Sequence, residues 1–315
     1  MQYGKLTFVQ NLQSLNAGLG DSAVSIGSFD GVHLGHQAVL RELLQQAKSD
    51  GLSSVAMTFE PQPREYFNES LAPARLMRLR EKVEVLSSLG IDRIVCLKFN
   101  RVLRALSAQE FIIRVLVEGL QVKYLIVGDD FRFGCDRSGD FSMLHDFGKA
   151  NGFSVKNTDT FESNGERISS TLVRRIVNEG DFPRAAELLG RPFEIKGRVV
   201  HGQKLGRKLG FPTANLNINR LRAPLSGVYA VLVKTESETF EGAANIGIRP
   251  TIGDLVRPLL EVHIFNFEQD IYGSFLRVEF LHKIRDELKF CDLGSLATRI
   301  QLDMHQIQQW FMTKR

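Results

Sequence analysis

The stretch Gly27-Ser-Phe-Asp-Gly-Val-His-Leu-Gly-His36 is a glycine-framed turn that carries two histidines, and the rest of the fold is organised around it. The apolar run at residues 23–29 is typical of a buried strand. After the turn, apolar residues recur at helical spacing over residues 39–47, until Gly51 stops the pattern. In an open α/β sheet, the carboxyl end of a strand and the next helix N-terminus form a ligand crevice suited to phosphate. The sequence therefore predicts a phosphate site at this turn.

The residue types of the turn fit contact with phosphate oxygens. Gly27 and Gly35 permit tight turns and close backbone approach. The imidazoles of His33 and His36 can donate hydrogen bonds to oxygens that gain charge in a transition state, and Asp30 is expected to cap or orient the turn. Two alternatives stay open, a satisfied pair of surface histidines and a metal pair. For zinc, the two histidines are three residues apart rather than four as in the helical metalloprotease motif, and no third ligand cluster is evident.

Composition indicates a soluble globular protein with room for two domains. The chain has 315 residues, of which 43% are hydrophobic and 24% charged. The three cysteines are far apart and suggest no disulfide framework, which favours a reducing, cytoplasmic setting. The N-terminus lacks the apolar core of a signal peptide, and we find no run of about 18 apolar residues that would span a membrane. The net charge of +4 comes from scattered basic residues, which suit phosphate-bearing small molecules as well as nucleic acid.

The first half of the chain alternates strands and helices. Strand-like runs lie at residues 54–60, 93–99 and 124–127, and helical patterns at residues 79–89 and from Ser107, where Glu110 completes a capping box. The apolar members of the helix at 79–89 are Val83, Val85, Leu86 and Leu89. This alternation predicts a mostly parallel, Rossmann-like sheet with its site at the carboxyl ends of the strands. Polar loops follow two of these strands, at residues 61–64 and 128–134.

The pattern changes after Gly190. A helix is expected to begin at residues 168–174, and its hydroxyl side chains fit two interpretations equally well, namely an ordinary helix cap and triphosphate binding. Asp181 is expected to cap another helix, which ends at Gly190. Strand-like segments then follow at residues 193–201, 227–234, 240–248, 259–267 and 275–281, which predicts an antiparallel sheet or small barrel. The chain ends in an amphipathic helix whose apolar stripe, from Leu293 to Phe311, is interpreted as core packing rather than a partner-binding surface.

The barrel segment carries a second group of polar motifs. Backbone N–H groups near Gly206 and Gly210 are suited to phosphate, although this is no Walker A sequence. Thr213 and Asn215 supply hard oxygen ligands suited to magnesium. Glu279 lies between apolar neighbours in a strand; a base for a substrate hydroxyl is one reading, and an outward-facing strand residue is the other.

These motifs, taken in order, resemble those of the bacterial bifunctional riboflavin kinase/FAD synthetase family over nearly the whole chain. The resemblance runs through the turn at 27–36, Thr58-Phe-Glu-Pro-Gln-Pro63, Gly128-Asp-Asp-Phe-Arg-Phe-Gly134, Ile168-Ser-Ser-Thr171 with Arg174, Gly210-Phe-Pro-Thr-Ala-Asn215, Ala244-Asn-Ile-Gly-Ile-Arg-Pro-Thr251, Glu261-Val-His263, Asp270-Ile-Tyr-Gly273 and Val278-Glu-Phe280. Two departures stand out: Gln62 replaces the histidine of a Pro-His-Pro turn, and Asn266 stands where an aspartate is common.

The resemblance implies a Rossmann-like HxGH nucleotidyltransferase domain at residues 1–186 and a small β-barrel flavokinase domain with a C-terminal helix at residues 187–315. It implies that the barrel phosphorylates riboflavin with ATP, giving FMN, and that the N-terminal domain adenylylates FMN to FAD. It also implies that Glu279 is the catalytic base, that His33 and His36 bind the transferring phosphates, and that Thr213 and Asn215 hold Mg²⁺. The residues expected to bind nucleotide are Gly27, Phe29, Asp30, Gly35, Asp130, Ser169, Ser170, Thr171, Arg174, Gly206, Gly210, Thr213, Asn215 and Arg249.

Two other functions remain as alternatives. One is an adenylyltransferase for another phosphorylated cofactor precursor, with the barrel as a binding module. The other is a flavin-sensing or RNA-binding regulator, against which scattered basic charge and intact candidate catalytic residues count. The expected partners are small molecules, namely riboflavin, FMN and ATP, with no nucleic acid, no membrane, and a monomer or weak homo-oligomer. Phe131 and Phe133 are interpreted as core residues in preference to residues that contact the flavin.

Overall fold

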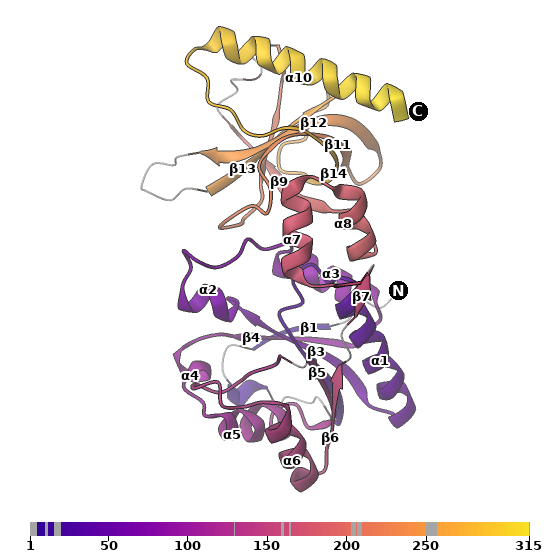
Figure 1. The fold of residues 1–315 in the computed structure, drawn as a ribbon, viewed down its shortest axis with the longest axis vertical. Coiled ribbons are helices and arrows are strands. Elements are labelled where there is room, and N and C mark those ends of the chain that lie inside the picture. The colour runs from indigo at the N-terminus through magenta and orange to yellow at the C-terminus, as the bar shows by residue number, and fades with distance from the viewer. Residues whose placement is uncertain are drawn as a thin grey trace. The chain divides into compact units, whose positions relative to one another are not determined.

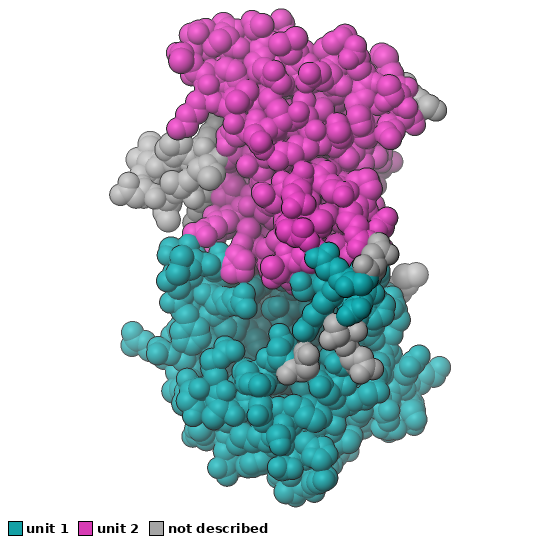
Figure 2. Space-filling view, viewed as in Figure 1, with its two compact units in different colours: residues 1–72, 79–169 teal, residues 73–78, 170–315 magenta. Residues whose placement is uncertain are grey.

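The computed structural model describes residues 5–9, 12–15, 20–128, 130–158, 161–163, 165–202, 206, 210–249 and 257–314. The chain forms two compact units (Figure 2), one of residues 1–72 and 79–169, the other of residues 73–78 and 170–315. The loop at residues 203–209, apart from Gly206, lies outside the described residues, as does Asp129.

The first unit is built on a six-stranded sheet in which every neighbouring pair of strands is parallel, as predicted (Figure 1). In order across the sheet, the strands are β1 (Lys5–Val9), β4 (Arg93–Lys98), β3 (Ser53–Glu60), β2 (Ser22–Ile26), β5 (Val122–Gly128) and β6 (Ser154–Thr158). The edge strands β1 and β6 are additions to the sequence prediction. Phe29 lies outside β2, in the turn, with a φ of 45°, although its ring is buried.

Helices cover both faces of this sheet. The long helix α1 (Leu34–Asp50) packs across β2, β3 and β5 and ends at Gly51, whose φ of 67° is left-handed. Buried apolar residues of α5 (Ala108–Phe111) and of a π-helix at Ile112–Val117 join a core with the alternate side chains of the central strands. The capping box of Ser107 and Glu110 is present as predicted. The remaining elements are a 3-10 turn at Leu12–Ser14, α2 (Pro63–Phe67), α3 (Leu79–Ser88), α4 (Arg101–Arg104), α6 (Phe141–Asn151), β7 (Glu162–Ser163) and β8 (Glu166–Arg167).

The buried side of α3 differs from the prediction. Leu86 is buried as predicted, but Val83, Val85 and Leu89 are only half-buried. The charged residues Glu81 and Lys82 are buried instead. The apolar period therefore predicted the buried Leu86 correctly and missed the two charged residues that are buried as well.

The second unit is a closed six-stranded antiparallel barrel with helices (Figure 1). Around the barrel the order is β10 (Ala214–Asn217), β13 (Arg257–Ile264), β12 (Thr239–Arg249), β11 (Gly227–Lys234), β14 (Phe275–Arg285) and β9 (Glu194–Val200). The sequence did not predict β10, because residues 210–215 were interpreted as a ligand-binding loop. Before the barrel come α7 (Ser170–Glu179) and α8 (Phe182–Leu189), with Asp181 as the predicted N-cap.

The C-terminal helix α10 (Leu293–Lys314) packs on the outside of the barrel. Ile307 and Phe311 are buried against Val228, Ala230 and Ala243, which confirms the interpretation of the stripe as packing. Leu293 is the exception, since it is 57% exposed at the helix start. None of the helices in the described ranges combines the length and the apolar character needed to cross a membrane.

Candidate active sites

The first candidate site lies at the point where the strand order of the parallel sheet reverses. From β2 the chain proceeds to β3 and β4 on one side, and then to β5 and β6 on the other. Ligands of open α/β sheets bind outside the carboxyl ends of the strands at such a point. The turn at residues 27–33 follows β2, and the loop at residues 128–134 follows β5, so both line this edge.

The turn itself has an unusual backbone. Phe29, Gly31 and Val32 have φ values of 45°, 80° and 40°. Left-handed conformations of residues other than glycine cost about 1–3 kcal/mol each and cluster at functional sites. Asp30, between them, is fully buried. It is not the helix cap, because His33 occupies the N-cap position of α1.

The two histidines are tightly placed. His33 Nδ1 accepts a hydrogen bond from the backbone N–H of His36 at 3.3 Å, so neutral His33 carries its proton on Nε2. The rings stack with centroids 3.7 Å apart. Burial, followed by the nearby His33 and Lys82, holds the pKa of His36 well below its usual range, so its imidazole is neutral at pH 7. His36 Nδ1 is buried and has no hydrogen-bond partner in the described part of the chain.

Gly35 leaves little room for a side chain beside the histidines. A Cβ at Gly35 would lie 3.2 Å from His33 Nδ1 and 3.5 Å from the carbonyl oxygen of Ile168. The segment that leads to Ser169 therefore lies against the turn, which brings the start of the motif at residues 168–171 to the site. Ser170, Thr171 and Arg174 belong to the second unit, where Arg174 Nε donates to the carbonyl oxygen of Ala74 at 2.7 Å.

The other residues predicted for this site lie along the same edge. The N–H of Gly27 donates to the carbonyl oxygen of Met57 on β3 at 3.0 Å. Asp130 is exposed, and its Oδ1 would be 3.2 Å from a Cβ placed on Gly128. Phe133 is buried and belongs to the core, as interpreted from the sequence, with Phe131 packed against it. In the described ranges we find no group of three His, Cys, Asp or Glu side chains that could hold a metal ion.

An aromatic cluster at the carboxyl ends of β3 and β4 was missed by sequence reasoning. Phe67 is 60% exposed, and its ring makes edge-to-face contacts with Tyr66 and Phe99. Phe59 also contacts Phe99 edge to face, and the Arg104 guanidinium lies 5.4 Å from the centre of the Phe67 ring. An exposed, held aromatic ring offers a stacking surface for a planar ligand.

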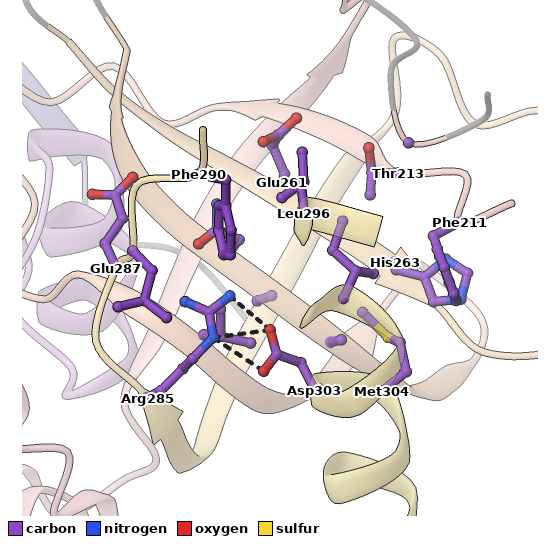
Figure 3. Close-up of a pocket in the computed structure, with 17 residues that line it drawn as sticks. Phe211, Thr213, Glu261, His263, Arg285, Glu287, Phe290, Leu296, Asp303 and Met304 are labelled. Atoms are coloured by element: carbon purple, nitrogen blue, oxygen red, sulfur yellow. Dashed lines mark hydrogen bonds and ion pairs between the residues drawn. The ribbon is translucent and has the colours of Figure 1, made fainter. Parts of the chain in front are cut away.

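The second candidate site is a pocket of about 270 Å³ between the outer face of the barrel and α10 (Figure 3). Polar side chains from three strands line it, namely Thr213 beside β10, Glu261 and His263 on β13, and Asn245 on β12. Glu261 and Thr213 project to the same side of the pocket in Figure 3. Apolar walls come from Phe211, Phe290, Leu296, Ile300 and Met304. A mostly apolar pocket with a few convergent polar groups is typical of a small-molecule site.

Strand register explains why these polar groups converge. Asn215 on β10 is directly opposite Glu261 on β13, and Glu261 is directly opposite Asn245 on β12. Directly opposed residues have Cβ atoms about 4.5–5.5 Å apart. Asn215 is 6% exposed. A further contact anchors the loop before β10, because His263 Nδ1 lies 2.7 Å from the carbonyl oxygen of Pro212.

Of the remaining predicted residues of this site, Gly206 and Gly210 lie in the loop before β10, and Arg249 lies on β12. Gly206 lines the pocket, and its carbonyl oxygen accepts from the N–H of Phe211 at 2.8 Å. Gly210 is exposed, with a φ of 87°. Arg249 ends β12, opposite Arg257, and its side chain lies outside the described residues.

Glu279 does not join this pocket. In the closed strand order, β14 is three strands away from β13, so Glu279 and Glu261 lie on opposite sides of the barrel. The neighbours Val278 and Phe280 point into the core, and Glu279 Oε2 instead lies 2.6 Å from Lys234 Nζ. Burial lowers the pKa of Lys234 and hydrogen bonds from Glu279 and Glu194 raise it, with a raised pKa as the net result. Of the two interpretations of Glu279, the structure agrees with a strand residue that faces outward from the barrel.

The far wall of the pocket is fixed by a buried carboxylate. Asp303 on α10 is 2% exposed and accepts hydrogen bonds from Arg285 at 2.7–3.0 Å and from Arg299 at 2.9 Å (Figure 3). Arg285 lies at the end of β14, so this cluster joins α10 to the barrel. Sequence reasoning missed it because Arg285 and Asp303 are far apart in the chain and belong to no motif.

Comparison with known proteins agrees with this division into two sites. A family model described as FAD synthetase matches residues 16–172, and one described as riboflavin kinase matches residues 189–311. The protein named bifunctional riboflavin kinase/FMN adenylyltransferase from Pseudomonas fluorescens is 48% identical, over 95% of this chain and 96% of its own. Proteins of the same name from Haemophilus influenzae and Escherichia coli K12 are 47% and 46% identical, over 97% and 91% of this chain and 99% and 92% of their own.

The fold also matches a solved structure over nearly its full length. The crystal structure of a protein named macrolide-efflux protein, from Streptococcus pneumoniae, has a TM-score of 0.77 and 30% identity, and covers 97% of this chain and 99% of that one. The fold and the two sites define a transferase in which a Rossmann-like nucleotidyltransferase sheet precedes a flavokinase barrel. The chain belongs to the bifunctional riboflavin kinase/FMN adenylyltransferase family.

Proposed function

We propose that this protein makes both flavin cofactors in two steps. The barrel transfers the γ-phosphoryl group of ATP to the 5′-hydroxyl of riboflavin, giving FMN and ADP. The N-terminal unit transfers AMP from a second ATP to FMN, giving FAD and pyrophosphate. The observation that carries the proposal is the presence in one chain of two separately built sites, the histidine turn at the strand-order reversal and the barrel pocket beneath α10. We assign the first activity to residues 187–315 and the second to residues 1–186.

In the barrel we assign the base to Glu261 rather than Glu279. Glu261 lines the pocket beside Thr213, whereas Glu279 is paired with Lys234 on the other side of the barrel. The riboflavin hydroxyl oxygen bonds to the γ-phosphorus of ATP, and the bond between that phosphorus and the ADP oxygen breaks. The carboxylate of Glu261 accepts the proton that the hydroxyl loses. Positioning by the apolar walls and by α10 accounts for the rest of the rate.

The residues around β10 fit a magnesium ion. Thr213 and Asn215 offer a hydroxyl and an amide oxygen, which are hard ligands, and the buried Asn215 is in register with the Glu261 carboxylate. We propose that these two side chains hold Mg²⁺, and that Gly206, Gly210 and Arg249 bind the nucleotide. When bound, the ion supplies charge neutralisation at the ATP phosphates.

At the N-terminal site, the attacking group is already an anionic phosphate of FMN, so no strong base is needed. We assign transition-state stabilisation to His33 and His36, whose positions are fixed by the N-cap hydrogen bond and by ring stacking. The exposed Phe67 ring, held by Tyr66 and Phe99, is proposed to stack on the isoalloxazine of FMN. The residues assigned to nucleotide binding are Gly27, Phe29, Asp30, Gly35, Asp130, Ser169, Ser170, Thr171 and Arg174.

The proposal extends to the setting of the protein. We propose that it works in the cytoplasm, as a monomer or weak homo-oligomer, on small molecules and not on nucleic acid or membranes. The Streptococcus pneumoniae protein is named for efflux, but the site chemistry found in this chain favours flavin synthesis. Size-exclusion chromatography with light scattering will measure the oligomeric state.

A time course of flavins tests the proposal. Purified protein is mixed with riboflavin, ATP and Mg²⁺, and the flavins are separated by chromatography. FMN is expected to rise first and FAD to follow, and chelation of Mg²⁺ with EDTA is expected to stop FMN formation. Riboflavin that stays unchanged with folded protein would refute the assignment of the barrel. FMN that accumulates without conversion would refute the assignment of the N-terminal unit.

A further inference from the structure

A buried lysine lies beside the histidine turn, outside every motif of the sequence. Lys82 on α3 is 1% exposed, and its Nζ lies 3.3 Å from the hydroxyl oxygen of Thr58 on β3. Moving an ammonium group out of water costs several kcal/mol unless the surroundings compensate, so lysines are almost never fully buried without a specific reason.

The position of Thr58 places this ammonium at the functional edge of the sheet. Thr58 follows Met57, which is in register with Ile26 at the end of β2. The carbonyl oxygen of Met57 accepts the N–H of Gly27, the first residue of the turn. The ammonium of Lys82 therefore lies next to the start of the turn. Its charge also contributes to the lowered pKa of His36, which requires the two groups to be within electrostatic reach.

Two other side chains at this edge each have a buried polar atom for which the ranges that the structure describes offer no hydrogen-bond partner. These atoms are Nδ1 of His36 and Nε2 of Gln62. Gln62 is 9% exposed and stands two residues after the end of β3, so it shares the carboxyl edge with the turn after β2. Native proteins satisfy nearly all buried polar groups, so an unsatisfied one calls for an explanation, and a catalytic role or a bound ion is among the usual ones. An ammonium, an amide N–H₂ and an imidazole nitrogen together suit an oxyanion.

We propose that Lys82 is a phosphate-binding residue of the adenylyl-transfer site, and that it acts with His36 and Gln62 on a phosphate oxygen of ATP or FMN. The proposal rests on the adenylyltransferase function proposed above and adds a cation to that site. A charge held in a dry site before the substrate arrives offsets the repulsion between two anionic reactants without reorganisation. A lysine that only ties α3 to β3 would have no such effect on substrate binding.

The test compares full-length variants in FMN adenylylation, with the KM for ATP and the KM for FMN measured separately. Lys82→Met removes the charge and keeps most of the volume, Lys82→Arg keeps the charge, and Lys48→Met alters an exposed lysine of α1 as a control. Riboflavin phosphorylation in the same samples reports whether the barrel is intact. Lys82→Met is expected to raise one KM about 10- to 100-fold, as for the loss of one charged hydrogen bond. The substrate whose KM rises identifies the phosphate that Lys82 contacts.

Binding of inorganic pyrophosphate, followed by calorimetry, gives a readout without turnover. Wild-type protein and Lys48→Met are expected to bind it equally, and Lys82→Met to bind it more weakly. Should Lys82→Met fail to fold, Thr58→Val removes the hydroxyl that fixes the ammonium and is expected to raise the same KM about 3- to 10-fold. Unchanged KM values and pyrophosphate affinity in folded Lys82→Met or Thr58→Val would overturn the proposal. Wild-type protein without FMN adenylylation would instead overturn the function on which it rests.

Discussion

The two carboxylates of the barrel give the sharpest prediction, because sequence and structure favour different ones. Glu261→Gln keeps the volume of the side chain and its place between Asn215 and Asn245, so the barrel should fold unchanged. The amide cannot accept the proton of the riboflavin hydroxyl. Loss of a general base lowers a rate about 10²- to 10⁴-fold, or roughly 3–5 kcal/mol in the barrier.

The matched variant is Glu279→Gln. It removes one charge from the ion pair with Lys234, whose side chain is 28% exposed and keeps Glu194 as a partner at 2.9 Å. A charged hydrogen bond contributes about 1.5–3 kcal/mol, and solvent screening with the remaining partner reduces the loss to about 1 kcal/mol. Glu279→Gln should therefore shift the denaturation midpoint slightly and leave the rate of phosphorylation within about threefold.

The assay is FMN formation from riboflavin at saturating ATP, with FMN-to-FAD conversion by the same samples as the internal control. Both variants should convert added FMN at the wild-type rate, because the adenylylation site is in the other unit. Glu279→Gln protein that is folded but has lost phosphorylation, with Glu261→Gln still active, would refute the reasoning from strand order.

Two further predictions concern one site each. His36→Ala should lower FAD formation about 10²- to 10³-fold while FMN still accumulates, because it removes a neutral imidazole from the buried pair. The control, His145→Ala at an exposed histidine, should change neither product. Normal FAD output from His36→Ala would remove this residue from the mechanism. Asp303→Ala should destabilise the docking of α10 by about 3–5 kcal/mol, because it leaves the partly buried Arg285 and Arg299 without their carboxylate. The control is Asp286→Asn, at an exposed aspartate, which should cost less than about 1 kcal/mol. The fluorescence of Trp310, the only tryptophan and a residue of α10, follows this unfolding, and an unchanged midpoint for Asp303→Ala would contradict the anchoring role.

Local patterns were enough for most of the fold. The parallel sheet, the helix caps at Ser107 and Asp181, and the left-handed stop at Gly51 all follow from periodicity and end signals. The histidine turn was predictable for the same reason, since a glycine-framed turn between a strand and a helix has one usual place in an α/β sheet. The missed strand β10 is short and half-polar, so no alternation marks it.

The class of each unit and the turn that we propose as the first site can be predicted from the sequence, because hydrophobic period and turn chemistry act over a few residues. The choice of the carboxylate that meets Thr213 depends instead on the order of strands around a closed barrel, which the folded chain alone reveals. The same holds for the burial of Lys82 beside the histidine turn, and for Arg285 and Asp303 at the far wall of the pocket. Contacts between distant segments depend on register and packing, and neither of these is written in any short stretch of the chain.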